Sequence, residues 1–152
     1  MSQPTLMNKY GLTFHHLGLA VKAPEAAVTF LSALGYIIGK SVLDARQNVH
    51  LLMCDHPTMP SIEVISPGEK PGPLHRLLVR HQEGLVYHMC YTTLNPTASL
   101  QAMQAEGGLR LSCVSLPKAA VLFGGKQVSF YLVANIGLIE LIDESTAVRP
   151  NT

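Results

Sequence analysis

The sequence lacks the features that identify most extracellular, membrane and nucleic-acid-binding proteins. Its three cysteines are an odd number without close spacing, which argues against a disulfide framework or a cysteine-ligated zinc site. The formal net charge is only +1, and no basic run or aromatic-basic stripe indicates nucleic-acid binding. No apolar run is long enough to span a bilayer. No cationic segment followed by an apolar one opens the chain, so we expect no signal peptide and a soluble, cytoplasmic protein.

Apolar residues, in contrast, are plentiful. They make up 47% of the 152 residues, which is enough for a hydrophobic core in one domain or in two small fused units. The 12 glycines and 10 prolines predict frequent turns between short elements. The composition therefore favours a globular protein with a real core and argues against disorder.

One order of elements occurs twice along the chain. The first copy has a strand, a helix closed by Gly35 and three further strands, expected at 12–21, 24–35, 36–43, 49–55 and 61–67. The second copy has the same order, with its helix capped by Asn95, at 85–93, 95–108, 109–116, 126–133 and 137–143. We therefore predict an α+β fold of two βαβββ modules whose curved sheets face each other across a cleft.

The predicted organisation is a single domain over residues 12–144. It consists of modules 12–67 and 84–144, joined by a linker at 68–83 with a short helix in its middle, and flanked by tails 1–11 and 145–152. In the first helix, the spacing of Ala27, Phe30, Leu31 and Leu34 predicts one apolar face.

Four polar residues stand at equivalent places in the two copies. His16 and His88 lie in the first strand of each copy, and Glu63 and Glu140 lie in the last strand among apolar neighbours. A buried carboxylate is costly unless a cation or strong donors meet it. We therefore expect the four side chains to converge on one divalent metal ion, for which zinc, nickel, cobalt, iron and manganese all remain open. Taken singly, each residue is more often a hydrogen-bonded or solvent-facing side chain than a ligand.

The adjacent histidines in FHHLGLAV (14–21) are predicted to differ in role. Neighbouring side chains of a strand point to opposite faces, so His16 shares a face with Gly18 and Ala20, and His15 lies on the other. The small residues leave space beside the imidazole of His16.

Several stretches together resemble a known family. HHLGLAV, SIEVISPGEKPGPLHRLL, EGLVYHMCY, GGKQVSF and GLIELIDE, in this order over residues 12–144, are similar to the vicinal oxygen chelate superfamily of glyoxalases and bleomycin-resistance proteins. Within it the sequence most resembles methylmalonyl-CoA epimerase. The resemblance implies the paired βαβββ fold, usually dimeric, and a metal site made by His16, Glu63, His88 and Glu140.

The resemblance also implies a reaction. In these enzymes the metal holds a carbonyl oxygen of the substrate and stabilises the enediolate formed when an α-proton leaves. Glu140 is the first candidate for the base, and Glu63 is the second. We therefore expect an isomerase or lyase, epimerase-like or glyoxalase I-like, whose small-molecule substrate is an acyl-CoA or another acyl thioester, and we expect a homodimer.

Two departures from the epimerases concern the handling of substrate. The epimerases have a further glutamate just before the third strand, where this chain has Arg46 and Gln47, with Asp44 nearby and predicted to be out of register. The loop between Phe130 and Glu140 is also shorter than in the epimerases.

Three alternatives to the isomerase stay open. A non-haem iron dioxygenase would use His16, His88 and Glu140 as a facial triad, although Glu63 as a fourth ligand argues against it. A non-catalytic, resistance-type protein would bind a small molecule without metal, and a purely structural protein would have no use for the four residues.

Overall fold

Strands account for most of the regular structure in the computed structural model, which describes residues 8–146. The described residues separate into two units: a first unit of residues 15–89 and a second unit of residues 8–14 and 90–146. The division falls inside β1 (Thr13–Ala20) and β6 (Leu85–Thr93), so each unit takes part of both strands. Within the range 8–146, no helix has the length and apolar character needed to cross a membrane.

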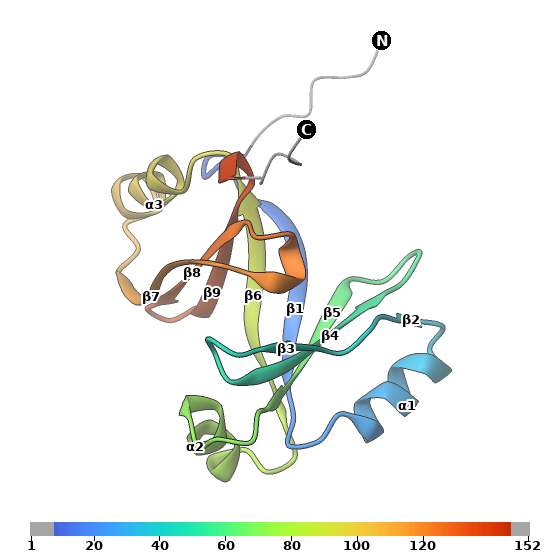
Figure 1. Cartoon of the computed structure of the whole chain (residues 1–152). Coiled ribbons are helices and arrows are strands. Elements are labelled where there is room, and N and C mark those ends of the chain that lie inside the picture. The colour runs from blue at the N-terminus through green and yellow to red at the C-terminus, as the bar shows by residue number, and fades with distance from the viewer. Residues whose placement is uncertain (1–7, 147–152) are drawn as a thin grey trace, which may run out of the picture. The chain divides into compact units, whose positions relative to one another are not determined.

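The first unit is a mixed sheet with a helix on one face (Figure 1). Its strands follow the order β2-β4-β5-β1, with β3 also paired to β4 and the first part of β6 beside β1. β1 is parallel to β5, whereas β4 is antiparallel to β2, β3 and β5. The elements after β1 are α1 (Glu25–Ala33), β2 (Ile37–Ile38), β3 (Val42–Asp44), β4 (Val49–Asp55), β5 (Ser61–Pro67) and α2 (Pro73–Arg80).

The predicted elements of this unit are confirmed with one correction. The helix expected in the middle of 68–83 is α2, and the strands expected at 49–55 and 61–67 are β4 and β5. The single strand expected at 36–43 is wrong, because the chain forms two short strands there, β2 and β3. Gly39 separates them and lies so close to β4 that a Cβ on it would be 2.7 Å from the carbonyl oxygen of Met53.

The buried side of α1 differs from the predicted one. Leu31 is fully buried in a cluster with Leu52 and Val64 of the sheet, and Ala27 and Val28 pack against it. Phe30, expected inside with Leu34, is 63% exposed. The helix therefore turns Ala27, Val28 and Leu31 toward the sheet. Ala27 and Leu31 belong to the predicted set, and Val28 takes the place of Phe30.

Strand pairing decides which side chains lie on the face away from α1. Paired residues share a face, and the register pairs Gly18 with Glu63 and Glu63 with Met53. Leu52 and Val64, which alternate with these residues, belong to the cluster beneath α1. His16 and Glu63 consequently lie on the face of the sheet opposite the helix.

The second unit repeats this plan. Its strands are the latter part of β6, β7 (Leu111–Ala119), β8 (Gln127–Val133) and β9 (Gly137–Asp143), in the order β6-β9-β8-β7, with antiparallel pairing of β7, β8 and β9. The helix α3 (Pro96–Ala105) begins at Asn95, whose side chain accepts a hydrogen bond from the backbone N–H of Ala98, as a cap should. Short 3-10 turns lie at Val121–Phe123 and Glu144–Thr146.

The last strand of each unit has the same relation to its helix. In β9, Ile139 and Leu141 pack with Met103 of α3, so Glu140 between them lies on the face away from α3. In β5, Val64 packs beneath α1 and Glu63 lies on the face away from it. The repeated βαβββ order is thus matched by equivalent positions of the two glutamates within their own units.

Candidate metal centre

Two imidazoles and one carboxylate meet on the face of the first unit's sheet that lies away from α1. His16 Nε2 lies 3.2 Å from His88 Nε2, and Glu63 Oε1 lies 3.7 Å from the former and 3.8 Å from the latter. All three residues are buried: His16 is 0%, His88 2% and Glu63 3% exposed. The structure therefore brings together the three predicted site residues of this unit in a place from which water is largely excluded.

The absence of a side chain at Gly18 makes room for this arrangement. Gly18 follows His16 by two residues on β1, on the same face, and pairs with Glu63 of β5. A Cβ built on Gly18 would lie 2.3 Å from Cε1 of His88, which is closer than any side chain tolerates. The space predicted beside the ring of His16 is thus occupied by the second imidazole, which stands edge-on to the first at a centroid distance of 5.3 Å.

The donor set and its spacing fit a divalent metal ion. Nitrogen and oxygen ligands at about 2.0–2.2 Å from one ion stand roughly 3.0–3.5 Å apart, which is close to the three separations observed. Imidazole nitrogen together with carboxylate oxygen suits zinc and the neighbouring transition metals. A buried carboxylate also needs a positive charge nearby to offset its loss of hydration. His16, Glu63 and His88 would hold such an ion.

The fourth predicted ligand belongs to the other unit. Glu140 lies on β9, pairs with Phe130 of β8 and is 2% exposed. Its position within its own unit matches that of Glu63, as described above. Its role as a ligand and as the first candidate for the base remains a prediction.

The contact between the two adjacent histidines was missed by the sequence analysis. The alternation of the strand separates His15 from His16, and the two residues were predicted to differ in role. In the structure their Nδ1 atoms are 2.8 Å apart and their rings stand edge-on at 79°.

The segment that departs from the epimerases forms a tight turn between β3 and β4. Arg46 is exposed there. Asp44 is 1% exposed and, because it pairs with Val49, lies on the same face of the sheet as Glu63. The expectation that Asp44 is out of register with the further glutamate of the epimerases stays a prediction. Its carboxylate accepts hydrogen bonds from Arg46 N, Gln47 N and Gln47 Nε2, which tie it to the turn.

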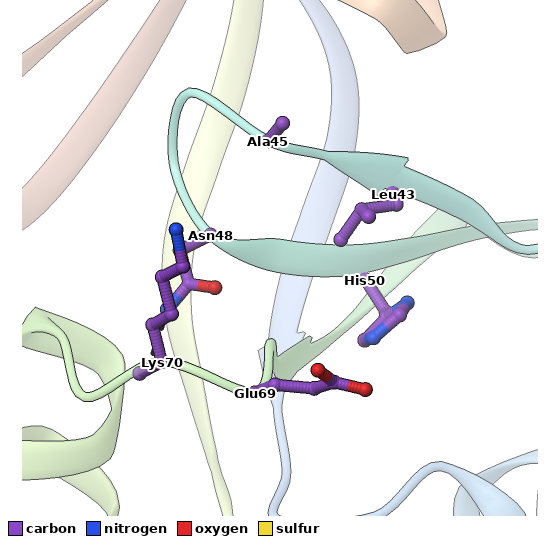
Figure 2. Close-up of a pocket in the computed structure, with 6 residues that line it drawn as sticks. All are labelled: Leu43, Ala45, Asn48, His50, Glu69 and Lys70. Carbon is purple, nitrogen blue, oxygen red and sulfur yellow. Dashed lines mark hydrogen bonds between the residues drawn. The ribbon is translucent and has the colours of Figure 1, made fainter.

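A separate pocket of about 310 Å³ lies on the opposite side of this sheet from Glu63. His50 of β4 lines it, and Figure 2 shows the imidazole directed from the strand toward the side of Glu69. The remaining lining residues are Leu43, Ala45, Asn48, Glu69 and Lys70. Because His50 alternates with Leu51 and pairs with Ser66, it shares the face of Leu52 and lies outside the candidate metal centre.

No activated thiol accompanies the site in the first unit. Cys54 is fully buried in the cluster beneath α1. Burial raises the pKa of its thiol, and the neighbouring charge of Asp55 raises it further. A thiol of this kind stays protonated and inert, so the chemistry of the unit rests on its imidazoles and carboxylates.

Repeated βαβββ units with buried glutamates on equivalent strands, one of them beside two buried histidines, define a class of α+β proteins with a candidate metal site. Residues 15–130 match the family model of the Glyoxalase/Bleomycin resistance protein/Dioxygenase superfamily. The chain therefore belongs to this superfamily, also known as the vicinal oxygen chelate superfamily, and the predicted fold is confirmed.

Solved structures agree with this fold at low sequence identity. Methylmalonyl-CoA epimerase from Mycobacterium tuberculosis is 18% identical, with a TM-score of 0.67 over 94% of this chain and 92% of that one. A hypothetical protein from Bacillus halodurans C-125 is 15% identical, with a TM-score of 0.71 over 91% of this chain and 99% of that one. A Streptomyces coelicolor methylmalonyl-CoA epimerase in complex with 2-nitronate-propionyl-CoA is 20% identical, with a TM-score of 0.66 over 91% and 98%. No curated protein sequence matches the chain with significance.

Proposed function

We propose that the protein is a divalent-metal-dependent enzyme that moves a proton at the carbon next to a carbonyl group. The observation that carries this proposal is the convergence of His16, Glu63 and His88 within 3.8 Å of one another in a buried place. Glu140 would be the fourth ligand, because it occupies on β9 the place that Glu63 occupies on β5. A divalent ion, when bound there, supplies positive charge beside the oxygen on which negative charge develops.

The proton transfer itself would be carried out by side chains of the site. The two imidazoles are neutral donors, so the carboxylates are the groups able to accept a proton from carbon. Glu140 is proposed as the base: it takes the α-proton on a carboxylate oxygen and returns a proton to the adjacent carbon, whereas inversion at the same carbon would need a second group to deliver the proton to the opposite face. Glu63 is the second candidate. Burial of both carboxylates keeps bulk water from exchanging the transferred proton.

The proposed substrate is an acyl-CoA or another acyl thioester. The support is the likeness of the fold to epimerases, one of which is solved with a propionyl-CoA analogue. The proton next to a thioester carbonyl is a weak acid, which is the kind of proton that needs both a base and a positive charge nearby. The resemblance further supports a homodimer as the working form and an epimerase-like or glyoxalase I-like outcome of the transfer.

The test has two stages. Metal content is first measured by mass spectrometry on purified wild type, on His88→Ala and on His50→Ala, the last being a matched histidine outside the site. We expect about one divalent ion per chain in wild type and His50→Ala, and none in His88→Ala. A wild type that binds none of cobalt, nickel, zinc, manganese or iron overturns the proposal.

The second stage measures exchange of the α-proton of an acyl-CoA in deuterated water. Loss of a general base typically costs about 10²–10⁴-fold, so Glu140→Gln should slow the exchange by that range. Glu144→Gln, which alters an acidic residue in the adjoining 3-10 turn, serves as the control and should exchange like wild type. Equal exchange in wild type and Glu140→Gln would remove Glu140 from the role of base.

A second candidate function rests on the composition of the site. The first unit by itself supplies two histidines and one carboxylate, the donor set of non-haem iron oxygenases. Selective loading with ferrous iron, with oxygen consumption and no proton exchange, would favour this dioxygenase over the isomerase.

A further inference from the structure

The second ring nitrogen of His16 has a specific neighbour. Nδ1 of His16 lies 2.8 Å from Nδ1 of His15, the residue before it on β1. The rings stand edge-on, with centroids 5.0 Å apart and an interplanar angle of 79°, so one nitrogen points at the other within hydrogen-bond distance. His16 is fully buried, whereas His15 is half-buried.

The position of Nε2 decides which of the two nitrogens donates. Nε2 of His16 is directed at the candidate metal centre, 3.2 Å from His88 Nε2 and 3.7 Å from Glu63 Oε1. A histidine that binds a metal through Nε2 carries its proton on Nδ1. The Nδ1–H of His16 then donates to Nδ1 of His15, and His15 carries its own proton on Nε2.

We propose that His15 is a positioning residue that holds His16 in its metal-binding tautomer and orientation. The proposal rests on the proposed metal site and deepens it. Histidine ligands commonly donate their second N–H to a carboxylate, a backbone carbonyl or water. In this chain an imidazole from the preceding residue takes that place, which explains two adjacent histidines at the start of an otherwise apolar strand.

Two substitutions of His15 test whether its hydrogen-bond acceptor, rather than the bulk of its side chain, positions His16. Asn carries its Oδ1 close to where His carries Nδ1, so His15→Asn keeps the acceptor, whereas His15→Leu removes it and keeps the bulk. His50→Asn and His50→Leu are matched controls on a half-buried strand histidine of the same unit.

The first measurement is the affinity for cobalt or zinc, by competition with a chromophoric chelator. Loss of an outer partner of a ligand typically costs about 10–100-fold in metal affinity, and we expect this for His15→Leu. His15→Asn should bind close to wild-type strength, and both His50 variants should bind as wild type does. Circular dichroism shows whether each variant is folded.

The second measurement needs no metal. Nitrogen-15 NMR of the metal-free protein reports the tautomer of His16 directly. We expect the Nδ1–H form in wild type and His15→Asn, and a shift toward the Nε2–H form in folded His15→Leu. Unchanged affinity and an unchanged tautomer in His15→Leu would overturn the role of His15 while leaving the metal site in place. A wild type that binds no metal would overturn the proposed function itself, and the role of His15 with it.

Discussion

At the scale of single residues, a glycine decides where the imidazole of His88 lies. Gly18 shares a face of β1 with His16 and pairs with Glu63, so it stands between two of the proposed ligands. The ring of His88 fills the volume that any side chain at this position would take. Because residue 18 has no side chain, the ring of His88 can bring its donor atom within 3.2–3.8 Å of those of His16 and Glu63.

Replacing Gly18 by alanine should therefore damage the metal centre. A Cβ at 2.3 Å from Cε1 of His88 forces the imidazole to move, and a ligand displaced from its place binds weakly. We expect Gly18→Ala to lower the affinity for cobalt by about tenfold or more, measured by titration of the visible absorption of the bound ion.

Gly72→Ala provides the comparison. A Cβ there would make an ordinary contact, 3.6 Å from Asn48 Nδ2, so we expect unchanged cobalt binding. Wild-type affinity in Gly18→Ala would show that His88 is not a ligand in the conformation described here.

Alternation along a strand predicts the face on which a side chain lies, but not its rotamer. The rule places Cβ atoms, and it correctly predicted that His16, Gly18 and the space beside them share one face. It does not describe rotamers, so the approach of His15 to His16 was not predictable from it.

At the scale of elements, a buried carboxylate closes the turn between β3 and β4. Asp44 accepts hydrogen bonds from two backbone N–H groups and one side-chain amide of the next three residues. Short polar side chains commonly close turns in this way. The hydrogen bonds of this carboxylate are thus made within the turn, although Asp44 lies on the same face of the sheet as Glu63.

Removal of this carboxylate should cost stability. Asp44→Ala leaves three partly buried donors of the turn without their carboxylate acceptor, and such a loss typically costs about 1–3 kcal/mol. We expect that decrease in the free energy of unfolding, measured by urea denaturation, with metal affinity unchanged.

Arg46→Ala is the control for the same turn. Its side chain is exposed and its backbone N–H still reaches Asp44, so the expected change is within about 0.5 kcal/mol. If folded Asp44→Ala binds metal normally but exchanges the α-proton much more slowly than wild type, Asp44 would instead take part in the proton transfer.

Most elements were predictable because their signals are local. Alternating or continuous apolar runs between turn residues predicted β4, β5, β6 and β9 at the observed bounds. The break between β2 and β3 was not predictable, because it depends on the approach of Gly39 to a strand that follows later in the chain. The buried side of α1 was predicted only in part, since several stripes of that helix have apolar residues at helical spacing.

At the scale of the whole molecule, duplication of one βαβββ order is what made the site predictable. A single strand histidine or glutamate carries little information, but each copy of the βαβββ order in the sequence has a histidine in its first strand and a glutamate in its last. In the structure, Glu63 lies on the face of its sheet away from α1, and Glu140 lies on the face of its sheet away from α3. The metal and the substrate were not predictable in the same way, because a mixed imidazole and carboxylate set suits several ions and the repeat contains no substrate-specific residue.

Binding of the metal should stabilise the whole chain. An ion that binds only the folded state contributes about 2.7 kcal/mol when its free concentration is 100 times its dissociation constant. At about 2–4 °C for each kcal/mol in a chain of this size, the midpoint of thermal unfolding should rise by roughly 5–10 °C. Differential scanning calorimetry of wild type with and without zinc or cobalt measures the rise, and a chelator should reverse it. His88→Ala lacks one of the proposed ligands and should show no rise at the same metal concentration. An equal rise in His88→Ala would mean that the stabilising ion binds at other groups, and the candidate metal centre would then be wrong.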